Sequence, residues 1–177
     1  SATVTENIIY TDTVPFTPGW NLMALSLQPE SVITAQQLCE QTASSGINVI
    51  EIDRWYAGGW DSHICGMPFN DFSIDLGKGF FARTIGTGNW SYQGTMPIGT
   101  ISIPISPGWN LISIPGDRGI TANELLSEMN TQGLVCSELD RWYAGGWDAH
   151  IFNVPFNDFL VEMSVGYFVR CQNSGNL

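Results

Sequence analysis

The sequence predicts a β-dominated α+β protein made of two homologous tandem units. A nine-residue segment, Asp-Arg-Trp-Tyr-Ala-Gly-Gly-Trp-Asp, occurs at 53–61 and again at 140–148. From Thr34 onward the two copies stay in register with one constant offset. Short runs of β-branched and aromatic residues bounded by glycine and proline recur along each copy, which is typical of strands. A repeat of this length indicates one supersecondary unit used twice.

We expect the units to span residues 1–90 and 91–177, each with about five strands and one short helix. A chain of 177 residues is long enough to bury a core, either as one body or as two small ones. The preferred arrangement is a pseudo-twofold pair packed as a barrel or sandwich, because a shared sheet would remove open strand edges.

Each unit begins with a β-prone lead-in strand, and an apolar strand follows a Pro-Gly turn. A hairpin comes after the helix, with Ala-Gly-Gly as its turn because glycine tolerates positive φ. A last strand closes the unit. The expected strands are 8–11, 20–27, 47–56, 60–64 and 79–83 in the first unit, and 98–105, 109–114, 134–143, 147–151 and 166–170 in the second.

The helix of each unit has clear start and stop signals. Thr34-Ala-Gln-Gln37 and Thr121-Ala-Asn-Glu124 fit the capping box, in which threonine accepts from a backbone amide and glutamine or glutamate reaches back. Gly46 and Gly133 are placed to end the helices.

The charge balance excludes two classes of partner. Six basic residues stand against seventeen acidic ones, for a net charge of −11. Nucleic acid needs basic side chains to replace phosphate counterions, and an anionic membrane surface also attracts basic segments. No apolar run approaches the roughly 18–20 residues that span a bilayer, so membrane insertion is not expected. A start at Ser1 and the composition indicate a piece of a larger polypeptide that is secreted or displayed at the cell surface.

The four cysteines allow two disulfides with three connectivities. Their positions are Cys39, Cys65, Cys136 and Cys171, and none is repeated between the units. We favour Cys39–Cys65 and Cys136–Cys171, one in each unit, with free buried thiols as the alternative.

The strand motifs carry a family resemblance. Gly19-Trp20-Asn21-Leu22, the hairpin Trp55 to Trp60, and Gly77-Lys78-Gly79-Phe80-Phe81 together resemble a tandem β-module found in extracellular multidomain proteins of bacteria and archaea. The second copy departs from the pattern, with Ser164-Val165-Gly166-Tyr167-Phe168 in the closing strand. The resemblance implies an accessory, surface-associated role and no specific reaction.

The repeated hairpins are the candidate binding sites. Strand alternation places Glu51, Asp53 and Trp55 on one face, opposite the aliphatic face that should join the core. Aromatic rings beside carboxylate, imidazole and guanidinium groups are the chemistry that a sugar requires. The candidate ligand-binding residues are Asp53, Arg54, Trp55, Trp60, Asp61 and His63, with their counterparts Asp140, Arg141, Trp142, Trp147, Asp148 and His150.

The competing interpretation is that the hairpin tryptophans are packing residues. Burying one indole is worth about 4–6 kcal/mol, which favours a place in the core or between the units. For the same reason we expect Trp20 and Trp109 to be buried strand residues, and Trp90 to pack where the units join.

Catalysis and metal binding are weaker hypotheses. Glu51 with Asp53, and Glu138 with Asp140, lie two apart on a strand, a spacing that overlaps the carboxylate separations of glycosidases. Adjacent outward carboxylates are more often simply solvated, and we expect no catalytic residues. No cofactor is expected; calcium is the metal that the loop oxygens would suit, with Asp71, Asp75, Asp158 and Glu162 as candidates.

The sequence therefore predicts a non-catalytic carbohydrate-binding module with two equivalent aromatic sites and a polysaccharide as its partner. Two sites would raise avidity for a polymer if both can engage at once. The alternative is a structural or adhesive module whose hairpins pack the units together. A glycan hydrolase is the third hypothesis.

Overall fold

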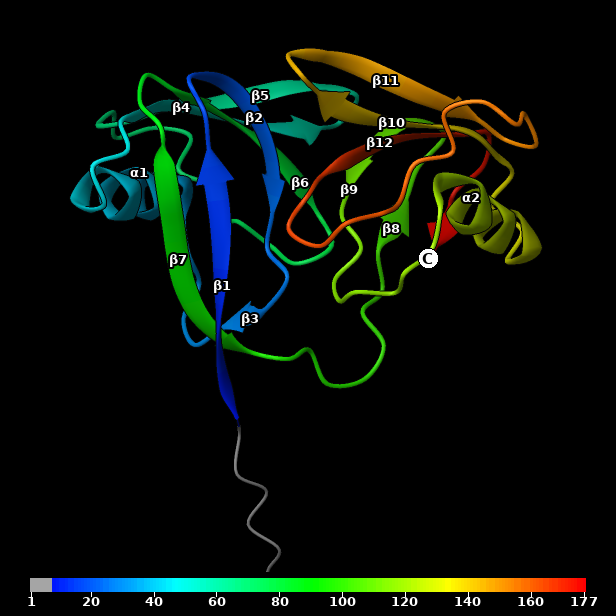
Figure 1. Cartoon of the computed structure of the whole chain (residues 1–177), viewed down its shortest axis with the longest axis horizontal. Coiled ribbons are helices and arrows are strands. Elements are labelled where there is room, and N and C mark those ends of the chain that lie inside the picture. Colours follow the sequence, from blue (N-terminus) through cyan, green and yellow to red (C-terminus); the bar gives the residue numbers. More distant parts are fainter. Residues whose placement is uncertain (1–7) are drawn as a thin grey trace, which may run out of the picture.

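The computed structural model describes residues 8–177 and confirms a β-dominated α+β protein with antiparallel sheets and two helices (Figure 1). No sheet within residues 8–177 closes on itself, so the expected barrel is wrong. The strands of the first half are β1 (Ile9–Phe16), β2 (Gly19–Ala24), β3 (Gln28–Pro29), β4 (Val49–Tyr56), β5 (Gly59–Ile64), β6 (Gly79–Thr84) and β7 (Gly88–Thr95). Those of the second half are β8 (Pro104–Ile105), β9 (Gly108–Ile112), β10 (Cys136–Tyr143), β11 (Gly146–Ile151), β12 (Tyr167–Cys171) and β13 (Gly175–Asn176).

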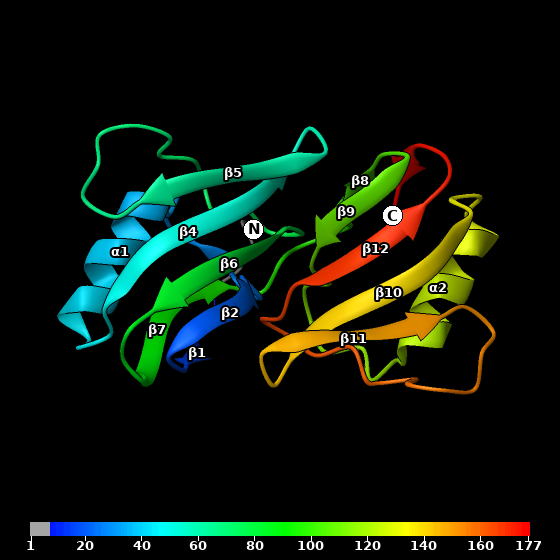
Figure 2. The same ribbon diagram turned by 90° about the horizontal axis from the view of Figure 1, so that it is seen from above.

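Two four-stranded sheets form one broad face of the molecule. Their strand orders are β2-β6-β4-β5 and β9-β12-β10-β11, so corresponding strands occupy corresponding places. Figure 2 shows the sheets side by side, with the tip of each hairpin reaching toward the first strand of the other sheet. We call the surface of the sheets that faces away from the helices the outer face.

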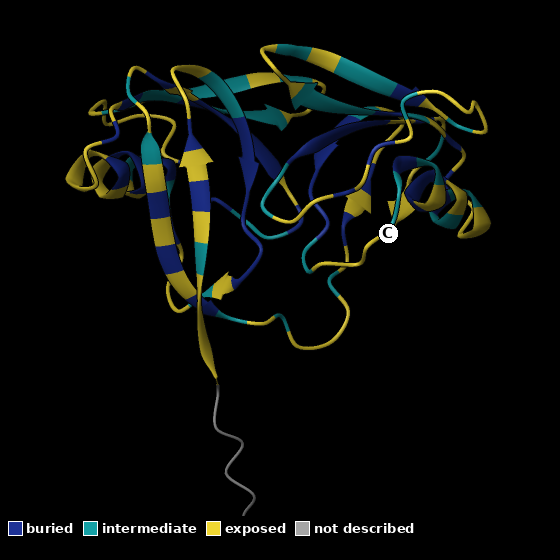
Figure 3. Ribbon diagram, in the orientation of Figure 1, coloured by how far each residue is buried: buried dark blue, intermediate teal, exposed yellow. Residues whose placement is uncertain are grey.

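Each half has its own core beneath its sheet (Figure 3). In the first half the small sheet β1-β7-β3 and α1 (Ala35–Ser44) cover the inner face of β2-β6-β4-β5. In the second half α2 (Ala122–Thr131) and the two-stranded sheet β13-β8 do the same. The inner face of each sheet is therefore buried in a core, and only the outer face is open to a ligand.

Both helices begin as the sequence predicts. Thr34 and Thr121 accept hydrogen bonds from the N3 backbone amides, and Gln37 and Glu124 complete the capping boxes. Gly46 and Gly133, which follow the helix ends, have φ of +78° and +87°. Only glycine adopts this conformation without strain, so the stop signals also hold.

Three strands were not predicted, and one prediction was too long. β3, β7 and β13 are new, and the expected strand 98–105 shortens to β8. Gly99, near its predicted start, has a positive φ of +82°, which is not strand geometry. β7 crosses the expected boundary at residue 90 and pairs along its length with β1. Trp90 lies within β7, is 1% exposed and stacks on Tyr92, so it is a packing residue. It packs in the core of the first half and not where the units join, so its expected location is wrong.

The two disulfides have the favoured pairing, one in each half. Cys39 in α1 joins Cys65 after β5, whereas Cys136 and Cys171 face each other across β10 and β12. Both bridges connect elements that surround a core, and each cross-links a different pair of elements.

The two halves meet through their backbones. The amide of Ala24 donates to Ser164 O at 2.9 Å, and the amide of Ser113 donates to Gly77 O at 3.0 Å. Between these bonds Gly79 and Gly166 pack against each other: a Cβ on Gly79 would lie 3.0 Å from the Cα of Gly166. The absence of side chains at these two positions is what lets the sheets approach so closely.

We expect Gly79→Ala to lower the free energy of unfolding by about 1–3 kcal/mol, the usual effect of overpacking. The new methyl group would also lie 3.0 Å from Leu111. Urea unfolding measures the change. Gly59→Ala is the control, because a Cβ there meets no atom within 4 Å. Equal stability of the two variants would contradict the close contact.

Candidate functional site

Strand alternation separates the predicted ligand set into two groups on opposite faces of each sheet. In β4 and β5, Asp53, Trp55 and Trp60 lie on the outer face. Arg54, Asp61 and His63 lie on the inner face, toward the helix. The prediction that all six residues form one site is therefore wrong. The reason is the two-residue period of a strand, which sends neighbouring side chains to opposite sides.

The arginine and aspartate of the inner group form a structural ion pair. Nη2 of Arg54 lies 2.7 Å from Asp61 Oδ2, and its guanidinium lies 4.4 Å from the centre of the Phe72 ring. Arg141 and Asp148 repeat the ion pair at 2.8 Å. These groups fasten the hairpin to the loop that follows it.

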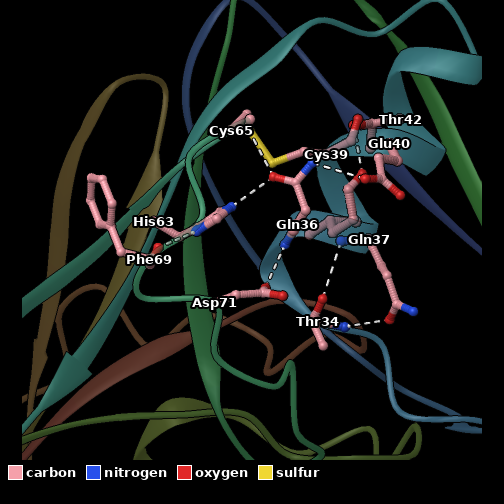
Figure 4. Close-up of a disulfide and its surroundings, with 12 residues drawn as sticks. Thr34, Gln36, Gln37, Cys39, Glu40, Thr42, His63, Cys65, Phe69 and Asp71 are labelled. Carbon is pink, nitrogen blue, oxygen red and sulfur yellow. Dashed lines mark hydrogen bonds between the residues drawn. A yellow bond between two sulfur atoms is a disulfide. The ribbon is translucent and has the colours of Figure 1, made fainter.

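The histidines are fully buried in the same region, and each is 0% exposed. Nδ1 of His63 lies 3.0 Å from the carbonyl oxygen of Phe69, and Nε2 lies 3.0 Å from Gln36 Oε1 (Figure 4). His150 makes the corresponding contacts with Phe156 O and Asn123 Oδ1. Each histidine thus bridges its loop and its helix and is not available to a ligand.

The candidate calcium residues have other partners. Asp71 and Asp158 accept the backbone amides of Gln36 and Asn123 at 2.8 Å, at the start of each helix. Asp75 pairs with Lys78 at 2.8 Å. Glu162 belongs to no cluster either, since residues 8–177 contain no group of three or more acidic, histidine or cysteine side chains placed to hold a metal ion.

The outer face carries a cluster of eight aromatic rings over the junction of the halves, which we call the junction cluster. Its members are Trp20, Trp55, Trp60, Phe81, Trp109, Trp142, Trp147 and Phe168. The two phenylalanines are buried, and they lie under the ring layer with Leu22 and Leu111. Sequence reasoning did not include either phenylalanine in a site, although both recur at equivalent places in the two copies.

The exposed tryptophans bridge the two halves. Trp60 lies edge-on to Phe81 and to Phe168, with 5.6 Å between ring centres in both cases. Trp147 contacts the same two phenylalanines at 5.7 and 5.3 Å. Edge-to-face pairs of this kind stabilise beyond their buried area. Even so, Trp60 is 48% exposed and Trp147 is 47% exposed.

The other hairpin tryptophans point across the junction. Nε1 of Trp55 donates to the carbonyl oxygen of Trp109 at 2.8 Å, and Nε1 of Trp142 donates to that of Trp20 at 3.0 Å. Trp20 and Trp109 were expected to be buried but are only half-buried. Their rings lie in the junction cluster on the outer face and not in the core beneath the sheets. The packing interpretation therefore holds for Trp55 and Trp142, whereas Trp60 and Trp147 keep half of their surface in solvent.

A recess of about 220 Å³ opens on the outer face among these rings. It is built by both halves, and its lining consists of Trp20, Asp53, Trp60, Phe81, Trp142 and Trp147. One carboxylate surrounded by five aromatic rings is its only charged group.

The surroundings of Asp53 and its counterpart Asp140 disfavour the charged form of the carboxyl group. Oδ1 of each is buried and has no hydrogen-bond partner within residues 8–177. Burial, together with the nearby Glu138 and Asp148, raises the pKa of Asp140 to about 7. Burial also raises the pKa of Asp53, but the Ser62 hydroxyl opposes this effect. Ala149 faces Asp140 in the position that Ser62 has beside Asp53, so that donor is missing in the second half.

Comparisons with known protein families, curated proteins and solved structures gave no match to this chain. The candidate site is therefore defined by its geometry.

We expect Asp140→Asn to become more stabilising, relative to the native chain, as the pH rises from about 4 to about 7. The folded chain holds a proton on Asp140 that the unfolded chain releases near the ordinary pKa of 3.8, so this residue costs stability as the pH rises through that interval. Urea unfolding at pH 4 and pH 8 measures the difference. Ala149→Ser should lower the pKa of Asp140 in a carbon-13 NMR titration. A pH-independent effect of Asp140→Asn would contradict the assignment.

Proposed function

We propose that the protein is a non-catalytic glycan-binding module whose site is the outer face over the junction. The observation that supports this most strongly is the exposure of Trp60 and Trp147, at 48% and 47%. Leaving half of an indole in water forgoes roughly 2–3 kcal/mol of burial for each ring. Flat rings held rigidly at a surface suit the C–H face of a sugar.

The rims of the aromatic surface hold groups suited to hydroxyls. Arg83 lies 5.8 Å from the centre of the Trp20 ring and 3.7 Å from Glu51. Arg170 stands 5.9 Å from the Trp109 ring in the other half. Guanidinium groups donate and carboxylates accept, so a hydroxyl finds both kinds of partner beside an aromatic platform.

The proposed site is single and composite, which revises the expectation of two equivalent sites. Trp60 and Trp147 both rest on Phe81 and Phe168, so neither ring can be assigned to a site in one half alone. The reciprocal bonds of Trp55 and Trp142 are compatible with a pseudo-twofold pairing of units, which forms part of the proposal. A polysaccharide would lie across both halves.

The wider setting of the proposal is a secreted or surface-displayed polypeptide of which this chain is one part. Two disulfides suit an oxidising compartment. The described chain has no helix long and apolar enough to cross a membrane. A net charge of −11 favours neutral or cationic partners over nucleic acid.

The second candidate is a structural module in which the hairpins serve only to join the halves. The indole bonds from Trp55 to Trp109 and from Trp142 to Trp20 favour it. It accounts for the half-buried tryptophans, but gives no reason for the exposed pair.

We expect Trp60→Ala combined with Trp147→Ala to abolish retention in gels that contain a bound polysaccharide, while the thermal unfolding stays cooperative. Trp55→Ala with Trp142→Ala is the matched pair, and should lower stability because it removes both indole bonds. Affinity electrophoresis over a panel of neutral and amino glycans measures binding, and circular dichroism measures the fold. Retention of the native chain by no glycan of the panel would contradict the proposal and favour the structural candidate.

A further inference from the structure

We propose that the recess around Asp53 receives a cationic amino group of the glycan, so that the ligand is a polymer with unacetylated amino sugars. The inference rests on the proposed function and adds the chemical class of the ligand.

The lining of the recess is suited to an organic cation. It is lined by five aromatic residues, and its one charged group is a carboxylate. Aromatic faces attract alkylammonium groups by their quadrupole, more strongly when water is excluded. A neutral sugar would use the rings but would leave the carboxylate without a counter-charge.

The Asp53 carboxylate has no cation of its own. Arg54, its neighbour in the strand, points to the inner face and pairs with Asp61. Arg83 on the outer face is held by Glu51. No lysine or arginine lines the recess, and Oδ1 of Asp53 is buried without a partner in the described chain. A bound ammonium would supply the missing positive charge.

The same features disfavour other sugars. A uronic acid or a sulfated sugar would place a negative charge beside Asp53 in a protein of net charge −11. An acetylated amino sugar has no charge to complement the carboxylate. Selectivity for the free amine therefore follows from one side chain.

The second half provides a matched control. Asp140 is the equivalent acid, and its Oδ1 is also buried and unpaired. It does not line the recess, which Trp20 and Phe81 form on the side of Asp53. Asp53→Asn and Asp140→Asn are therefore the same chemical change at equivalent places, of which only the first alters the recess.

The experiment is calorimetric titration at pH 8, above the raised pKa of about 7 for Asp140. The probes are a glucosamine oligomer with permanently charged trimethylammonium groups and its N-acetylated counterpart of equal length. We expect the native chain to bind the charged oligomer at least about 10-fold more tightly, a difference of about 1.4 kcal/mol. Asp53→Asn should remove this preference, whereas Asp140→Asn should keep it.

Two results would overturn the inference. The first is equal affinity of the native chain for both oligomers. The second is the same loss of preference in both variants, which would indicate a general attraction of the charged oligomer to an acidic protein. Binding of both oligomers without preference would leave the proposed function intact, whereas binding of neither by a folded chain would remove it as well. A further measurement uses the native chain, so that its result does not depend on whether a variant folds. The charged oligomer must lower the pKa of Asp53 in an NMR titration, and an unchanged pKa contradicts the contact.

Discussion

The contact between Gly79 and Gly166 is the constraint on which the rest of the structure depends. Their backbones pack directly against each other, so the two sheets come close enough for each hairpin tip to reach the other half. Trp55 and Trp142 then find backbone acceptors across the junction, at Trp109 and Trp20. A larger residue at either glycine would separate the sheets and leave two indole N–H groups without these partners.

Because the sheets approach so closely, the two tryptophans of each repeated hairpin have different environments. In each copy the two tryptophans face each other across the strand pair and share the outer face. Trp55 and Trp142 are half-buried and hydrogen-bonded across the junction. Trp60 and Trp147 lie against Phe81 and Phe168 with about half of their surface in solvent. Packing, one of the rival explanations for a tryptophan in the sequence, thus accounts for Trp55 and Trp142, whereas binding by the exposed Trp60 and Trp147 is the proposal. Of the two buried aspartates, Asp53 alone lines the recess, and its carboxylate is the electrostatic basis of the proposed selectivity.

Local signals in the sequence were sufficient for most of the elements. The capping boxes at Thr34 and Thr121 and the glycine turns of the hairpins depend on a few adjacent residues, and they hold. The role of His63 was not predicted: it follows Trp60 by three residues, so it lies on the opposite face of the strand, where it bonds to Gln36 in the helix. The junction cluster was not predictable from alternation. Alternation predicts which side chains share a face of a sheet. Which part of that face is covered by other residues depends on how the second half of the chain packs against the first.

Hydrogen exchange of the indole N–H groups, followed by NMR, tests the central claim that the hairpin tryptophans have different roles. We expect slow exchange for Trp55 and Trp142, whose indole protons are bonded across the junction. We expect fast exchange for Trp60 and Trp147, which are half exposed and donate to no acceptor within residues 8–177. Similar exchange rates for all four indoles, or protection of Trp60 and Trp147 alone, would contradict the difference in roles.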